Sequence, residues 1–174
     1  MPTYYPVKRM GITLDEQNFI LKRLIQFKTE GDVLDIGSGN SLIPIQLSKA
    51  WNKKIIAADI WDEFPIELAK RNADEEKASV DFIRIERPNL KLPFPESSFS
   101  FIYSIMFVYN LRKNEREALF SEIHRVLKEG GSFLLVDPVI VRKERKELKG
   151  FTETLYKEEN ALFYYLAKKV NRPS

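Results

Sequence analysis

The apolar positions of the chain change repeatedly from a helical spacing to short continuous runs. After a capping-box sequence at 13–16, apolar residues recur every three or four positions and predict a helix that ends at 30–31. Further helices are predicted from 40–41, over 62–76 with Asp62 as its cap, and from 114 to the glycines at 130–131. Continuous apolar runs predict five buried strands, at 32–37, 53–60, 80–86, 99–108 and 132–137.

Strands that alternate with helices predict a doubly wound, mostly parallel α/β sheet covered on both faces. The segments 151–157 and 161–169 are instead aromatic and alternating, so they predict an antiparallel hairpin that brings the sheet to seven strands. An amphipathic helix over 151–169 is the alternative. We expect one domain over 1–174, with a tail or lid at 1–12, a core at 13–138, and a short helix and the hairpin at 139–174.

A glycine-containing turn joins the first strand to the next helix, in the sequence DVLDIGSGNSLIPIQL. Gly37 and Gly39 let a ligand approach the backbone, and the helix that follows offers free N–H groups. The third glycine of a dinucleotide fingerprint would fall at position 42, where Leu42 stands, and the Gly-Lys-Ser/Thr of a P-loop is absent. The turn is therefore not typical of a pyrophosphate site.

Two carboxylates indicate which ligand the turn suits. Asp35 precedes the turn, where it would repel a pyrophosphate and attract an ammonium group. Asp59 ends the second strand and can accept two hydrogen bonds from a ribose diol. S-adenosylmethionine carries a ribose, an ammonium and a carboxylate together, so we expect it as the cofactor. An NAD(P)-dependent enzyme is the weaker alternative, because Leu42 and Asp35 both oppose it.

Composition narrows the remaining function classes. The chain has 174 residues and no cysteine, which excludes disulfides and thiolate chemistry. Its single histidine, His124, excludes a His-rich metal site, and we expect no bound metal. A net charge of +3 permits a nucleic-acid partner without demanding one. No apolar run is long enough for a membrane helix and no signal peptide is visible, so we expect a cytoplasmic protein without membrane contact.

Four motifs then stand in register: VLDIGSGNS, IIAADI, LPFPESSFSFIYSIMFV and EIHRVLKEGGSFLLVDP. With these the chain resembles the class I (Rossmann-like) S-adenosylmethionine-dependent methyltransferases, in particular the type 11 methyltransferase domain. The resemblance covers roughly residues 14–170, and the last segment looks like the sixth and seventh strands of that fold. It implies transfer of a methyl group to an acceptor that is either macromolecular or small. The oligomeric state stays open.

The resemblance also implies roles for individual residues. Those implied for the cofactor are Asp35 at its amino group, Gly37, Ser38 and Gly39 along its methionine part, Asp59 at the ribose hydroxyls, Ile60 and Trp61 near the adenine, Glu86 or Arg87 at the adenine edge, and Ser104 and Ile105 through their backbone. Those implied for the methyl group and the acceptor are Met106, Tyr109 and Asn110. No catalytic base is implied, since methyl transfer from a sulfonium chiefly needs proximity and orientation.

The sequence departs from the family pattern at three places. Ser41 stands where the family often has glycine, and we expect it to cap the following helix. Ser100 replaces a usual aspartate, and no clear aspartate follows the third strand. These departures leave a second hypothesis open, an inactive cofactor-binding subunit or scaffold. The basic run 142–149 is either a solvated helix face or a grip for an acidic or RNA substrate.

Overall fold

The computed structural model describes residue 4 and residues 13–62 and 64–170, which fall into two compact units, Met1–Arg84 and Ile85–Ser174. Except for Tyr4, the predicted tail or lid at 1–12 lies outside the described residues. The single-domain organisation stays a prediction.

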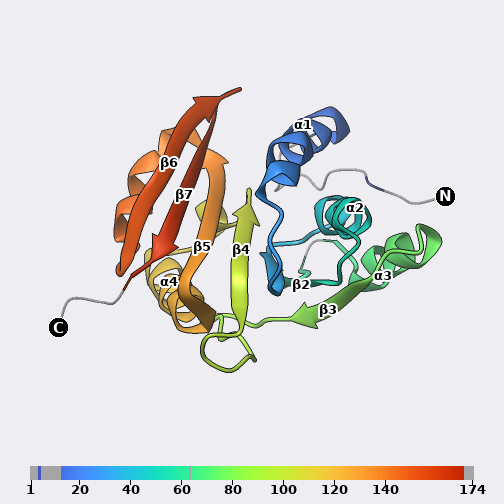
Figure 1. Cartoon of the computed structure of the whole chain (residues 1–174), viewed down its shortest axis with the longest axis horizontal. Coiled ribbons are helices and arrows are strands. Elements are labelled where there is room, and N and C mark those ends of the chain that lie inside the picture. Colours follow the sequence, from blue (N-terminus) through green and yellow to red (C-terminus); the bar gives the residue numbers. More distant parts are fainter. Residues whose placement is uncertain (1–3, 5–12, 63, 171–174) are drawn as a thin grey trace. The chain divides into compact units, whose positions relative to one another are not determined.

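The first unit is a three-stranded parallel sheet with helices between its strands (Figure 1). Its elements are α1 (Leu14–Leu24), η1 (Ile25–Phe27), β1 (Val33–Ile36), α2 (Leu42–Trp51), β2 (Ile55–Asp59), α3 (Ile66–Glu75) and β3 (Val80–Arg84). Ile56 of β2 pairs with Leu34 of β1 on one side and with Asp81 of β3 on the other. β1 and β2 are short apolar runs because strands in the middle of a parallel sheet are buried on both faces, whereas β3 is only partly buried.

Helix boundaries in this unit confirm some predictions and correct others. Thr13 caps α1 as predicted, its Oγ1 accepting the Glu16 N–H at 3.1 Å. However, α1 already ends at Leu24, and a 3₁₀ turn replaces the predicted last turns. The prediction of Asp62 as a cap was wrong. The cap position of α3 is Pro65, which has no side-chain donor or acceptor, and its fixed φ places the chain for helix entry.

The second unit carries the remaining strands in a mixed arrangement. Its elements are β4 (Phe99–Ile105), η2 (Val108–Asn110), α4 (Lys113–Val126), β5 (Leu127–Pro138), η3 (Val139–Glu147), β6 (Phe151–Glu159) and β7 (Leu162–Lys169). β4 and β5 are parallel, and β7 pairs antiparallel with both β5 and β6 (Figure 1). The core residues Tyr103, Phe133 and Phe163, one from each inner strand, are fully buried.

The sequence predicted that a helix ends at the glycine pair 130–131, and this prediction was wrong. α4 ends at Val126, and β5 runs through both glycines. The register with β4 jumps here, from Phe99 opposite Leu127 to Phe101 opposite Ser132, so the glycines lie in a wide irregularity of the strand. A Cβ on Gly131 would lie 2.8 Å from the backbone carbonyl oxygen of Lys128, which cannot move aside as a side chain can, and this explains the glycine at this bend.

The C-terminal hairpin is confirmed, and the alternative of one helix over 151–169 was wrong. Glu159 of β6 pairs with Leu162 of β7, so Asn160 and Ala161 alone form the turn. Both turn residues have positive φ, 53° and 62°, as a type I′ hairpin turn requires. With these strands the seven-stranded sheet has the order β3-β2-β1-β4-β5-β7-β6, which confirms the predicted fold class.

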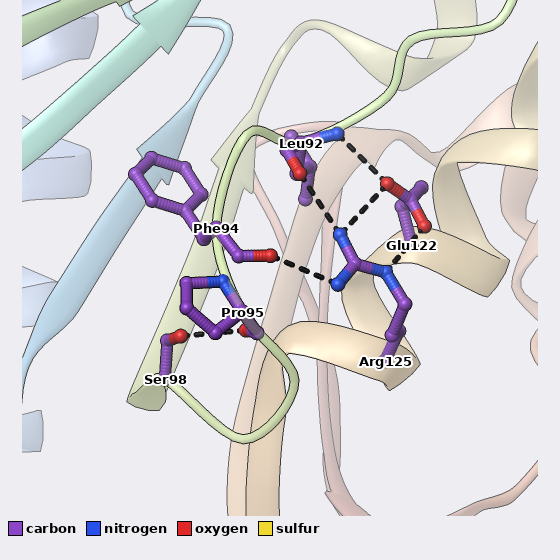
Figure 2. A network of polar contacts seen from close by, with 6 residues as sticks. All are labelled: Leu92, Phe94, Pro95, Ser98, Glu122 and Arg125. Carbon is purple, nitrogen blue, oxygen red and sulfur yellow. Dashed lines mark hydrogen bonds and ion pairs between the residues drawn. The ribbon is translucent and has the colours of Figure 1, made fainter.

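A charged pair on α4 holds the proline-rich loop that precedes β4. Figure 2 shows the Arg125 guanidinium between the carboxylate of Glu122 and two loop carbonyls, those of Leu92 and Phe94, each at 2.8 Å. The Glu122 carboxylate in turn accepts the Leu92 N–H at 2.8 Å. Because Leu92 is itself buried, the loop is attached to the helix by both polar and apolar contacts.

Candidate functional site

The turn after β1 is closed by hydrogen bonds to the neighbouring strand β2. The N–H groups of Gly37 and Ser38 both donate to the Ala58 carbonyl, at 2.8 and 3.2 Å. Gly37 and Gly39 have φ values of 88° and 52°, a conformation that glycine adopts without steric cost. The two glycines that the sequence singled out are thus required by the backbone of the turn.

Gly39 is held from both sides by residues at the end of β2. Its N–H donates to Asp59 Oδ2 at 2.6 Å, and its carbonyl accepts the Trp61 indole N–H at 2.9 Å. The other oxygen of Asp59 accepts the N–H groups of Ile60 and Trp61. The sequence predicted Asp59 and Trp61 as ligand contacts and did not indicate that they also lock the turn.

Ser41 does not cap α2, so this expectation was wrong. It lies at the cap position with φ of 66°, and its hydroxyl pairs with that of Ser38 at 2.8 Å. The Leu42 N–H is taken instead by the Asn40 side chain at 3.0 Å. A left-handed conformation costs free energy for any residue with a Cβ, which explains why glycine suits position 41. The hydrogen bond between the Ser41 and Ser38 hydroxyls offsets this cost.

Two buried carboxylates flank the closed turn. Asp59 is 9% exposed, and burial raises the pKa of its carboxyl while the N–H groups of Gly39, Trp61 and Ile60 lower it. Asp35 lies in β1, opposite Ala57, and is 3% exposed. The three N–H donors support a charged Asp59, and a carboxylate has about four acceptor positions, so Asp59 retains acceptor capacity.

The hydrogen bonds of the turn bear on the ligand class. A phosphate cradle needs backbone N–H groups that point at the ligand. Here the N–H groups of Gly37, Ser38, Gly39 and Leu42 all donate to acceptors within the chain. These four N–H groups are therefore not available to a phosphate, and the buried carboxylates Asp35 and Asp59 beside the turn suit hydroxyl and ammonium groups better.

The predicted acceptor residues follow β4 in the second unit. Ser104 is fully buried in the strand, and its hydroxyl has no hydrogen-bond partner among the described residues. Met106 turns the chain with φ of 55° and donates its N–H to the Val136 carbonyl at 2.8 Å. Tyr109 and Asn110 lie half-buried in η2 directly after this turn. The chain thus brings Met106, Tyr109 and Asn110 together in one short segment.

Asp137, which the sequence analysis did not single out, lies at the end of β5 beside this segment. It is 1% exposed, and neither carboxylate oxygen has a partner of full hydrogen-bond geometry among the described residues. Burial raises its pKa well above the ordinary value, as does Glu144, whereas the N–H groups of Phe107 and Tyr109 lower it. The one signal in the sequence was an acid at a strand end, which is common on surfaces too.

Arg116 supports the other end of the acceptor segment. Its guanidinium donates to the Leu111 carbonyl at 2.9 Å and forms ion pairs with Glu147 at 2.9 Å and Glu144 at 3.4 Å. Hydrogen bonding to Glu147 raises the pKa of Arg116, so it stays charged. The segment 106–111 is therefore attached to β5 at its start and, through Arg116, to η3 at its end.

The predicted site residues form two groups, one in each unit. In the first unit Asp59 and Trp61 bond to Gly39 of the turn, and Ile60 donates its N–H to Asp59. Glu86 is exposed in the second unit, and its carbonyl accepts the Leu90 N–H. The assigned roles of all these residues stay predictions.

No group of three or more His, Cys, Asp or Glu residues in the described ranges of the chain is placed to bind a metal ion. No helix within these ranges has the length and apolar content needed to span a membrane.

A family model described as a methyltransferase domain matches residues 33–131, more than half of the 174 residues. The chain belongs to this family of methyltransferase domains. The matched region runs from β1 into β5 and so includes the glycine turn, Asp59 and the segment after β4.

Curated relatives of this methyltransferase domain are named for several acceptors. A sterol 24-C-methyltransferase of Pneumocystis carinii is 32% identical over 66% of the chain and 30% of its own length. A ribosomal protein L11 methyltransferase of Dictyoglomus thermophilum is 32% identical over 76% and 41%. A putative protein N5-glutamine methyltransferase of Methanocaldococcus jannaschii is 29% identical over 82% and 75%. The chain spans less than half the length of the first two.

Solved structures support the fold of this methyltransferase domain. A SAM-dependent methyltransferase from Aquifex aeolicus superposes with a TM-score of 0.73 at 20% identity, over 89% of this chain and 90% of that one. A protein from Pyrococcus horikoshii has the same TM-score at 18% identity, over 97% and 96%. At these identities the likeness establishes the fold alone.

Proposed function

We propose that the protein is a methyltransferase that uses S-adenosylmethionine. The observation that carries this proposal is the glycine turn, whose N–H groups are used internally while the Asp59 carboxylate lies against Gly39 at 2.6 Å. Such a turn offers acceptors to a ribose diol and negative charge to an ammonium group. Membership of the methyltransferase domain family supports the same cofactor.

The residues present fit this cofactor. Asp59 would accept hydrogen bonds from the ribose hydroxyls, and Asp35 would attract the amino group. Gly37 and Gly39 leave room for the methionine part, because no Cβ stands on the turn there. When bound, S-adenosylmethionine supplies a methyl group already activated on a sulfonium, so the chain has chiefly to orient the reactants.

The segment after β4 is proposed to receive the acceptor. Met106, Tyr109 and Asn110 would line it, and the backbone of this segment is held by Val136 and Arg116. A segment fixed at both ends keeps an acceptor in one orientation, which is how an enzyme gains rate by proximity. The named relatives differ in acceptor, so the sequence likeness supports methyl transfer more than any one acceptor. A cytoplasmic location stays part of the proposal.

The first prediction is that the protein transfers methyl groups. Purified protein incubated with methyl-tritiated S-adenosylmethionine and a cell extract is expected to label one fraction: protein, RNA or small molecules. The control is the same mixture with heat-denatured protein. Cofactor binding without any label above this control would contradict an active enzyme and favour an inactive cofactor-binding subunit.

A further inference from the structure

A pocket of about 480 Å³ lies within the second unit, lined by α4, by the end of η3 and by Lys149, two residues after η3. Three lysines line it: Lys113 from the first turn of α4, and Lys146 and Lys149 from the end of the basic run. We call it the lysine pocket. Its volume is within the range of ligand-binding pockets. No residue predicted to bind cofactor or acceptor lines it.

The charges of the lysine pocket are unevenly matched. Two acids line it, Glu117 and Glu147. Glu147 is already used, because both its oxygens accept hydrogen bonds from Arg116, at 2.9 and 3.3 Å. Among the described residues the structure gives no ion pair to any of the three lysines. The pocket thus holds three ammonium groups, and Glu117 is the one lining carboxylate that is not already bonded to Arg116.

The basic run 142–149 has two kinds of members in the structure. Arg142 pairs with Glu158 of β6 at 3.3 Å, and the Arg145 guanidinium lies 4.5 Å from the centre of the Tyr156 ring. These two arginines attach η3 to the hairpin. Lys146 and Lys149, in contrast, are exposed and border the pocket. Lys143 is exposed as well but does not line the pocket, so the pocket gathers two of the three lysines of the run.

The lining favours an anion that carries several separated charges. Lysine is a point-charge binder of phosphate, and three lysines from two elements can contact successive phosphates of a flexible strand. Phe120, the aromatic residue of the lining, is 3% exposed, so it offers neither a stacking surface for a base nor an anchor for a protein side chain. The hollow also suits a strand that can bend into it better than a stiff duplex.

We propose that the lysine pocket binds the phosphate backbone of single-stranded RNA. The binding is independent of base sequence and depends strongly on salt, since phosphate contacts dominate it. It goes beyond methyl transfer and does not require it. Lys113 follows Leu111 closely in the chain, so a strand held at the pocket lies near the proposed acceptor segment.

The test compares two triple variants by fluorescence anisotropy with a labelled oligoribonucleotide of mixed sequence. Lys113→Ala, Lys146→Ala and Lys149→Ala together are expected to weaken binding at least tenfold at about 50 mM salt. The control changes Lys22, Lys70 and Lys128, which are exposed and elsewhere on the chain, to alanine. This control has the same net charge and is expected to bind within about twofold of the unchanged protein.

Salt dependence gives a second measurement. Each phosphate contact of a single strand contributes about −0.7 to the slope of log affinity against log salt, so the pocket variant is expected to lose a slope of roughly 2. Thermal unfolding of both variants checks that they fold. Equal binding by the pocket variant and the control would overturn the proposal. Tighter binding of duplex DNA or of polyglutamate than of the oligoribonucleotide would also overturn it.

Discussion

Arg125→Ala is expected to lower the free energy of unfolding by about 3 kcal/mol, measured by urea denaturation at neutral pH. The change removes the donors to the Leu92 and Phe94 carbonyls and leaves the Glu122 carboxylate without its cation. In Figure 2 all of these contacts converge on one guanidinium, so alanine breaks them together. Arg125→Lys keeps the charge without the planar fork and is expected to recover only part of the loss.

The control for this variant is Arg71→Ala, which removes an exposed arginine of α3 that has no ion pair with another described residue. It is expected to change the free energy of unfolding by less than about 0.5 kcal/mol. A loss of unfolding free energy as small as this in Arg125→Ala would show that the proline-rich loop is held without the contacts of Arg125.

The loss of stability in Arg125→Ala is expected to depend on pH. Hydrogen bonding to Arg125 lowers the pKa of Glu122 below its ordinary value of 4.5, against burial, which raises it. A carboxyl with a lowered folded pKa contributes stability above its unfolded pKa and loses it as the pH falls through the folded one. The stability difference between wild type and Arg125→Ala is therefore expected to narrow below about pH 4.5.

Asp59→Ala is expected to weaken the binding of S-adenosylmethionine by roughly 100-fold, measured by calorimetry. The variant removes the proposed acceptor of the ribose hydroxyls and the acceptor of the Gly39 N–H. Asp81→Ala is the matched control, an aspartate on the neighbouring strand β3 that forms an exposed salt bridge with Lys54. The control is expected to bind the cofactor like the wild type.

The ribose contact is separated from the role of Asp59 in the turn by a ligand pair. Wild type is expected to bind S-adenosylhomocysteine at least tenfold more tightly than its 2′,3′-dideoxy form, since the latter lacks both hydroxyls. Asp59→Ala is expected to bind the two forms with equal affinity. If the variant still distinguishes them as strongly as the wild type does, Asp59 holds the turn and does not bind the ribose.

The sequence predicted the strands well because β1, β2 and β4 are buried apolar runs and the hairpin strands are aromatic and alternating. It failed where tertiary contacts decide the local conformation. Gly130 and Gly131 have the composition of a helix end, yet they lie inside a bent strand, where Gly130 has a φ of 74° and Gly131 has no room for a Cβ beside the Lys128 carbonyl. Ser41 has the composition of a helix cap, yet its left-handed φ directs its hydroxyl to Ser38.

In the candidate site, too, the sequence predicted the residue types but not their contacts. The residue types Gly37, Gly39 and Asp59 were visible in the sequence, because a turn of this kind needs glycine and a ribose needs a carboxylate. The partners of these residues were not visible, since Asp59 and Gly39 are 20 positions apart and meet only in the folded sheet. Asp137 was missed for a related reason, because only the fold shows that this strand-end acid is buried.

The measurement that tests the account most directly is calorimetric titration of the wild-type protein with S-adenosylmethionine. We predict binding at one site per chain with a dissociation constant in the micromolar range, and no detectable binding of NADH under the same conditions. Absence of heat with S-adenosylmethionine up to about 1 mM, or binding of NADH in its place, would contradict the proposed cofactor.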